Sequence, residues 1–375
     1  MKIENKSIYF AYTSYHVFIA LLMALSKHNE KDEQQLVIIG NFSDAEKMYK
    51  SLVSCDNSPF NKVFYLRGEY NLQQYGSSYA RFFRYWGVLK ICQDVISLIN
   101  DEKITQIYLF NEERAYSLIL LNYISKLKGR IKASFIEDGT TIYSSYVERK
   151  DWHYLFLGKI FFGLWWKNVP VMGSSVVFDD IWAFFPQFVR EELKNKSIKS
   201  IPTNLIADLR TKKIASHILS NYGINSEYID KINCMVLLSH SSVINQFSEY
   251  RGMLSSLIKK MQTLGYQITI KYHPRDNASD DFLGLSSESN INVLHSSVPL
   301  ELIYVLGVDS IKVVISDMTT SALMAQLILK NTKVISIGAL LGSKDERFLN
   351  MLRCLGISLP ESFEDFDQCL VMGNA

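Results

Sequence analysis

The chain has 375 residues, of which 48% are hydrophobic and 21% charged, so it is a folded globular protein long enough for two domains. Its formal net charge of +2 argues against general binding of nucleic acid, which needs concentrated positive charge. The cysteines are scattered without metal-ligand spacing, which indicates reduced thiols in a cytosol. Since the sequence also shows no signal peptide and no apolar run of roughly 18 residues, we expect a cytoplasmic protein.

The first half of the chain alternates between predicted strands and predicted helices. Apolar runs predict strands at 7–12, 35–40, 62–66, 106–110 and 133–136, and helical spacing predicts helices near 14–25, 45–53, 79–98 and 115–127. This order is typical of a parallel sheet covered by helices. The alternation fades between about residues 144 and 231, where Asp179-Asp180 indicates a helix start.

The second half repeats the pattern. Strands are predicted at 234–238, 266–270, 291–294, 312–315 and 333–337, with helices between them. We therefore predict an α/β fold of two Rossmann-like domains, 1–190 and 191–375, with an interdomain cleft. Glycosyltransferases of the GT-B class have this architecture, but other two-domain α/β enzymes share it, so the architecture alone identifies no chemistry.

One candidate site follows the predicted strand 266–270. Pro274 ends the strand and places His273 where a loop begins. Ligands of open α/β sheets bind beyond the carboxyl ends of strands, and a histidine beside Arg275 suits a phosphate-bearing ligand. The alternative is a histidine in a tight turn beside a solvated arginine.

A second candidate site, Glu137-Asp138-Gly139, follows the strand 133–136 directly. A carboxylate at the end of a strand points into the cleft, where a general base must lie. The alternative is an ordinary turn, which Gly139 permits.

Two further motifs lie near predicted helix starts. Thr319, Thr320 and Ser321 follow a buried strand, and hydroxyls and free backbone amides there can bind an anion. The alternative is helix capping by Ser316 or Asp317. Glu301 lies just after a proline, where it either begins a helix or accepts hydrogen bonds from a ribose.

Weaker candidates lie after the first strand of each half. Thr13 and His16 lie at the start of the first helix beside the cleft, where they could contact an acceptor. Ser239 and His240 lie in a loop that could line a donor pocket. The other histidines are treated as structural or surface residues.

The order of the motifs resembles that of the bacterial sialyltransferases that build lipooligosaccharide and capsule, including the polysialyltransferase group. An acid-acid-Gly motif is followed by His-Pro and then by a cluster of hydroxyl residues, over 137–321. The opening segment 11–17 resembles the start of such enzymes more loosely. This chain differs from the family pattern in the hydroxyl cluster: Thr-Thr-Ser follows Asp-Met, where a serine pair is more usual.

The resemblance implies a role for each motif. Asp138 or Glu137 would deprotonate the acceptor hydroxyl, and we prefer Asp138 because it adjoins the turn. His273 would bind or protonate the departing CMP phosphate, residues 319–321 would hold that phosphate, and Glu301 would bind the cytidine ribose. Pro274 and Arg275 belong to the same implied donor site.

The implied chemistry needs neither a cofactor nor a metal ion. A CMP leaving group carries one phosphate, whose charge a protonated histidine and helix-start donors can offset. A single displacement by an activated hydroxyl inverts the anomeric centre. Asp365-Phe366-Asp367 has the form of a metal motif, but its acidic surroundings predict a solvated helix start instead.

The segment 152–166 is unusually rich in aromatic residues. It is too short to span a bilayer and too apolar for a free surface. A helix in the cytosolic membrane interface would fit, as would a homodimer contact or a covered interdomain helix.

Together these features predict an inverting, metal-independent sialyltransferase. It would move sialic acid from CMP-sialic acid to a terminal sugar of a bacterial surface glycan or glycolipid, such as lipooligosaccharide, O-antigen or capsule. One alternative is another donor: CMP-Kdo, CMP-pseudaminic acid, CMP-legionaminic acid or a nucleotide hexose. The other is a non-catalytic glycan-assembly subunit.

Overall fold

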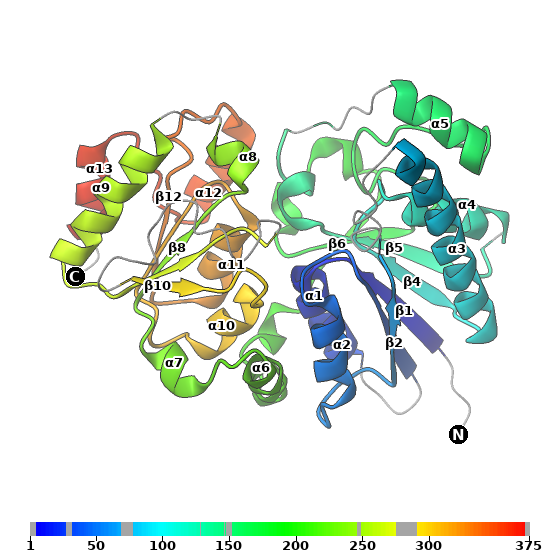
Figure 1. Ribbon diagram of the computed structural model, residues 1–375, viewed down its shortest axis with the longest axis horizontal. Helices are drawn as coiled ribbons and strands as arrows, with labels where there is room; N and C mark the ends of the chain where they lie inside the picture. Colours follow the sequence, from blue (N-terminus) through cyan, green and yellow to red (C-terminus); the bar gives the residue numbers. More distant parts are fainter. Residues whose placement is uncertain are drawn as a thin grey trace. The chain divides into compact units, whose positions relative to one another are not determined.

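The computed structural model describes residues 5–27, 32–68, 78–127, 129–145, 147, 152–245, 249–274 and 291–371. The chain divides into two compact units, Met1–Leu205 and Ile206–Ala375 (Figure 1). Each unit is a parallel sheet with helices on both faces, which is the predicted α/β architecture.

The first unit contains a seven-stranded parallel sheet in the order β3-β2-β1-β4-β5-β6-β7. In Figure 1, α1 and α2 lie on one face of this sheet and α3 and α4 on the other. The strands are β1 (Asn5–Ala11), β2 (Asp32–Ile39), β3 (Lys62–Leu66), β4 (Gln106–Leu109), β5 (Lys132–Ile136), β6 (Asp180–Ala183) and β7 (Ser197–Ser200). The helices are α1 (Ser14–Ser26), α2 (Ala45–Val53), α3 (Ser78–Asp101), α4 (Ala115–Lys126) and α5 (Trp152–Phe162), with short 3-10 turns η2 (Gly139–Ile142), η3 (Pro186–Phe188), η4 (Glu191–Leu193) and η5 (Thr203–Leu205).

The second unit contains a five-stranded parallel sheet in the order β10-β9-β8-β11-β12. Its strands are β8 (Cys234–Leu237), β9 (Ile268–Lys271), β10 (Ile291–Leu294), β11 (Val313–Ser316) and β12 (Lys333–Ser336). Its helices are α6 (Leu209–Asn221), α7 (Ser226–Asp230), α8 (Ser241–Ile244), α9 (Tyr250–Thr263), α10 (Leu300–Leu306), α11 (Thr320–Ile328), α12 (Glu346–Cys354) and α13 (Phe363–Val371).

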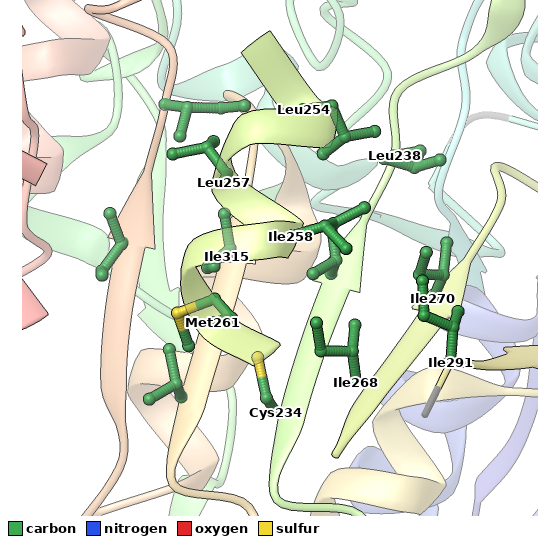
Figure 2. Close-up of a cluster of buried hydrophobic side chains, with 14 of the residues drawn as sticks. Cys234, Leu238, Leu254, Leu257, Ile258, Met261, Ile268, Ile270, Ile291 and Ile315 are labelled. Carbon is green, nitrogen blue, oxygen red and sulfur yellow. The ribbon is translucent and has the colours of Figure 1, made fainter. Parts of the chain in front are cut away.

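The core of the second unit shows why these strands carry short, continuous apolar runs. One face of α9 packs on the sheet, and buried hydrophobic side chains from both elements form one cluster (Figure 2). Because helices cover both faces of a parallel sheet, its strands are buried on both sides. The labelled core residues are Cys234, Leu238, Leu254, Leu257, Ile258, Met261, Ile268, Ile270, Ile291 and Ile315.

The structure differs from the sequence prediction in the middle of the chain. Asp180 begins strand β6, so the predicted helix start at Asp179-Asp180 is wrong. The preference of Asp for helix starts is overridden there because β6 pairs in parallel with β5 on one side and with β7 on the other. Since β7 still belongs to the first sheet, the first unit extends past residue 190 to Leu205.

Both sheets have a topological switch point, where the strand order reverses direction. In the first sheet it lies between β1 and β4, and in the second between β8 and β11. Loops that follow neighbouring strands on either side of a switch point diverge and leave a crevice at the carboxyl edge of the sheet, where ligands bind. The fold therefore defines one candidate binding edge in each unit.

Candidate functional site

The carboxyl edge of the first sheet carries a group of acidic and aromatic residues, which we call the acid site. It comprises Tyr15, His16, Asn111, Glu137 and Asp138. Two consecutive residues in the first turn of α1 bond to two consecutive residues after β5: Tyr15 to Glu137 and His16 to Asp138. These contacts join segments 122 positions apart in the sequence.

Asp138 lies in the centre of the acid site. Its Oδ1 is 2.8 Å from Nε2 of His16, and its Oδ2 accepts a 2.7 Å hydrogen bond from the side-chain amide of Asn111. Burial raises the pKa of Asp138, but His16, Asn111 and the positive charge of Arg114 outweigh burial and hold this pKa below its ordinary value. Since 24% of its side chain remains exposed, Asp138 is a charged carboxylate within reach of solvent.

His16 lies behind Asp138 and is 1% exposed. Its Nδ1 accepts a 3.2 Å hydrogen bond from the backbone N–H of Tyr12, so the hydrogen on Nε2 is directed at Asp138. The ring stacks on Phe110 at 4.4 Å between centroids. Thr13 is the N-cap of α1, and its hydroxyl accepts a 3.1 Å hydrogen bond from the backbone N–H of His16.

Glu137 is 1% exposed, and both of its carboxylate oxygens accept hydrogen bonds. The donors are the hydroxyls of Tyr15, at 2.5 Å, and Tyr143, together with the backbone N–H of Phe184 at 2.8 Å. Burial raises the pKa of Glu137 to about 7, although these hydrogen bonds favour its charged form. The side chain thus ties β5 to α1 and to the loop after β6, with little of it open to a ligand.

Asn111 is a site residue that sequence reasoning missed. Its Oδ1 accepts hydrogen bonds from the backbone N–H groups of Glu113 (2.9 Å) and Arg114 (3.0 Å), which fixes the amide so that Nδ2 points at Asp138. The available signal was an asparagine two residues after the end of β4, the strand that borders the switch point.

The carboxyl edge of the second sheet carries a second group, which we call the hydroxyl site. It comprises Ser239, His240, His273, Asp317 and residues 319–321. The rings of His240 and His273 meet edge to face, with centroids 5.4 Å apart. The structure therefore brings together the loops after β8 and β9.

Asp317 connects the loops of the hydroxyl site. It is 4% exposed and accepts hydrogen bonds from the backbone N–H of Ser239 at 3.2 Å and from the hydroxyl of Tyr250 at 3.1 Å. Burial raises the pKa of Asp317, an effect that the hydrogen bonds from Ser239 and Tyr250 only partly offset. The buried Asp317 therefore links the loop before α11 to the loop after β8 and to the start of α9.

The helix start at α11 is not capped by a side chain. Thr319 is the N-cap residue but makes no capping bond, and its hydroxyl instead lies 2.7 Å from that of Ser316. Capping of α11 by Ser316 or Asp317, the alternative left open by the sequence, is therefore wrong. Thr319, Thr320 and Ser321 are half-buried. The backbone N–H of Ala322 in the first turn donates a 3.2 Å hydrogen bond to the carbonyl of Thr319, so the amides of Thr320 and Ser321 are the ones that could bind an anion.

Glu301 lies in the first turn of α10 and is 7% exposed. Burial raises its pKa, and the neighbouring Lys271 partly opposes that shift. Lys271, at the end of β9, donates a 2.7 Å hydrogen bond to the carbonyl of Ser296, and burial lowers its pKa to about 8. Pro274 is exposed, whereas Arg275 lies outside the described residues.

The described residues contain no group of three or more His, Cys, Asp or Glu side chains placed to hold a metal ion. Asp365 and Asp367 lie in α13, where Asp367 forms a 2.8 Å ion pair with Lys260, so the predicted helix start is confirmed. Across the same part of the chain, no helix is long and apolar enough to cross a membrane.

Comparison with known proteins gives a consistent assignment. The family model described as alpha-2,8-polysialyltransferase (POLYST) matches residues 8–338, whereas no curated protein matches the chain. Among solved structures, an alpha/beta-galactoside alpha-2,3-sialyltransferase from Photobacterium phosphoreum is similar with 12% identity and a TM-score of 0.56, covering 96% of this chain and 99% of that one. A UDP-GlcNAc 2-epimerase from Methanocaldococcus jannaschii has 13% identity and a TM-score of 0.55, covering 99% and 93%. At such identities these structures show the fold alone, which is the GT-B-like arrangement of two Rossmann-like units.

Proposed function

The chain belongs to the alpha-2,8-polysialyltransferase family and is a glycosyltransferase, and on this premise we propose that it is an inverting, metal-independent sialyltransferase. Its donor is CMP-sialic acid, and its acceptor is a terminal sugar of a bacterial surface glycan or glycolipid. Because the family is described as an alpha-2,8-polysialyltransferase family, the first acceptor to test is a glycan that already ends in sialic acid.

The observation that carries this proposal is the contrast between the two adjacent carboxyl groups of the acid site. Asp138 is charged and partly exposed, whereas the oxygens of Glu137 are engaged and the side chain is buried. A general base must be deprotonated and within reach of the acceptor hydroxyl. We therefore assign the base to Asp138 and a positioning role to Glu137. His16, proposed from sequence to touch the acceptor, acts instead by orienting Asp138.

In the proposed reaction Asp138 takes the proton of the acceptor hydroxyl while the hydroxyl oxygen attacks the anomeric carbon of the donor. The bond from that carbon to the phosphate oxygen breaks, CMP leaves, and the anomeric configuration inverts. His273 binds or protonates the departing phosphate, and residues 319–321 hold it with hydroxyls and first-turn amides of α11. The reaction requires the acid site and the hydroxyl site to face a common cleft.

Several finer assignments belong to the same proposal. Glu301 binds the ribose, Ser239, His240, Pro274 and Arg275 line the donor site, and Thr13 lies beside the acceptor. Cytoplasmic location, peripheral contact of 152–166 with a membrane and homodimer formation also remain predictions. The alternatives are another donor, namely CMP-Kdo, CMP-pseudaminic acid, CMP-legionaminic acid or a nucleotide hexose, and a non-catalytic assembly subunit.

The test uses purified protein with CMP-sialic acid and a panel of galactoside and sialoside acceptors, with and without EDTA. We expect transfer in both conditions, and Asp138→Asn should abolish it while leaving CMP binding to the second unit intact. Thermal unfolding with CMP, UDP or GDP separates the donor alternatives, because stabilisation by UDP alone would exclude a CMP-linked donor. Transfer that needs a divalent metal, or that survives Asp138→Asn, would contradict the mechanism.

A further inference from the structure

Helix α5 presents an apolar stripe to solvent on the first unit. Trp152, Phe156 and Ile160 are 67%, 57% and 61% exposed, and their spacing of four residues places them on one face of the helix. The rings of Trp152 and Phe156 lie 6.5 Å apart between centroids, so the stripe is continuous along the helix surface. Leu164, just beyond the helix, is 90% exposed.

The outward orientation of the stripe is fixed by how the opposite face packs. A Cβ atom at Gly158 would lie 2.2 Å from the indole nitrogen of Trp166, so the glycine permits close contact with that buried ring. Trp166 packs with Leu118 of α4 and with Val169. Gly163, at φ +109°, then turns the chain and leads into the exposed Leu164. In Figure 1 α5 lies at the margin of the first unit near α4.

The charges around the stripe indicate what covers it. Between residues 152 and 178 the sequence contains two lysines, Lys159 and Lys167, and no aspartate or glutamate. Both lysines are exposed, and Lys159 lies three residues from Phe156, so these two side chains are neighbours on the helix surface. A two-fold contact between copies of this stripe would add a second Lys159 and, from the described residues 152–178, no acid to pair either lysine. Lipid phosphates supply the missing negative charge.

We propose that the stripe of Trp152, Phe156 and Ile160, together with the exposed Leu164, Lys159 and Lys167 nearby in the sequence, docks on an anionic lipid bilayer. Aromatic and aliphatic side chains of an interfacial helix lie at headgroup depth, while lysines reach the phosphates. α5 is anchored on α4, which begins just after Asn111 of the acid site. The bilayer would therefore lie on the side of the first unit where Asp138 is held. The inference does not depend on the proposed transferase activity.

The test is co-sedimentation of the full chain with vesicles of phosphatidylglycerol and phosphatidylcholine, compared with phosphatidylcholine alone, at low and high salt. We expect binding to the anionic vesicles to weaken with salt. The double variant Phe156→Ser, Ile160→Ser should lower vesicle binding about tenfold or more, because two apolar anchors are lost. The matched control is Leu209→Ser, Leu264→Ser, which removes leucines that are 68% and 51% exposed elsewhere on the chain and should bind as the wild type does.

Lys159→Glu tests the charge contribution and should weaken binding to anionic vesicles only. Thermal unfolding of each variant checks folding, which these exposed positions should leave unchanged. Equal binding by the wild type and the stripe variant, or no binding to anionic vesicles, overturns the proposal. Sedimentation of the wild type as a dimer that the stripe variant abolishes, without vesicle binding, would assign the stripe to a second copy instead. None of these assays uses a sugar donor, so failure here is distinguishable from failure of the proposed activity.

Discussion

The substitution Asn111→Asp tests how the acid site keeps Asp138 charged. The wild-type amide donates a 2.7 Å hydrogen bond to Oδ2 of Asp138, while its Oδ1 accepts two backbone hydrogen bonds. Aspartate retains the two acceptor contacts and the shape of the side chain but replaces the donor with a second carboxylate. The perturbation therefore acts on the charge of Asp138 with little change in the backbone turn.

The size of the effect follows from the contact that is lost. A hydrogen bond to a charged group contributes about 1.5–3 kcal/mol, and one pKa unit corresponds to about 1.36 kcal/mol, so the pKa of Asp138 should rise by about one to two units. Repulsion between the two carboxylates acts in the same direction. Because the base must be deprotonated, activity should be lost at a higher pH on the acidic side than in the wild type, where the pKa of Asp138 lies below its ordinary value.

The assay is kcat/KM for sialyl transfer as a function of pH, whose acidic limb reports the pKa of the base in the free enzyme. The matched control is Asn225→Asp, since Asn225 also accepts a backbone hydrogen bond at a helix start, from Tyr228 at 2.9 Å in the second unit. The control should keep the wild-type acidic limb. An unchanged limb in Asn111→Asp would refute either the role of this hydrogen bond or the assignment of Asp138 as the base.

Three further substitutions test the packing of the two sites. Glu137→Gln places an amide donor against groups that already donate, so the free energy of unfolding should fall by about 1–3 kcal/mol in chemical denaturation. The pKa of Glu137 is raised to about 7 from an unfolded value of 4.5, so its contribution to stability is complete below about pH 4.5 and is lost as pH rises to about 7. The free energy of unfolding should therefore fall less steeply with pH in Glu137→Gln than in the wild type. Tyr250→Phe removes a hydrogen bond to Asp317 and should cost about 1–2 kcal/mol of stability, measured by denaturant unfolding, and weaken CMP binding. Gly338→Ala would place a Cβ atom 2.2 Å from Cγ of Met318 and should weaken CMP binding, measured by calorimetry, by displacing the loop before α11.

Each of these substitutions has a control or a contradicting outcome. Burial also raises the pKa of Glu112 to about 7. Part of the dependence of unfolding free energy on pH should therefore remain when Glu137 is changed. A full wild-type slope in Glu137→Gln would contradict the raised pKa of Glu137. Gly252→Ala in α9 meets no atom within 4 Å and should leave CMP binding unchanged. Wild-type CMP affinity in Gly338→Ala, or unchanged stability in Tyr250→Phe, would show that the hydroxyl site does not depend on these contacts.

The positions of the motifs at strand ends could be predicted from the sequence because they depend on short-range patterns. Runs of apolar residues identify strands, and helical spacing identifies helices, without knowledge of distant contacts. Asp138, His273 and Thr319 each follow such a run, and the structure places them beyond β5, β9 and β11. The strand β6 was missed because its apolar residues follow Asp179-Asp180, which indicated a helix start, and β7 was missed because Ile198 is the one apolar residue among its four.

The sequence alone determined the alternating order of strands and helices and which motifs lie at strand ends, because hydrophobic periodicity is a local property of the chain. Tertiary structure decided the strand order, and with it the two switch points. It also decided that Tyr15 contacts Glu137, that His16 contacts Asp138, and that Asn111 donates a hydrogen bond to Asp138. Which of two adjacent carboxylates stays charged depends on burial and on donors contributed by segments far apart in the sequence. No spacing rule encodes those contacts, since they form only when β1, β4 and β5 lie side by side.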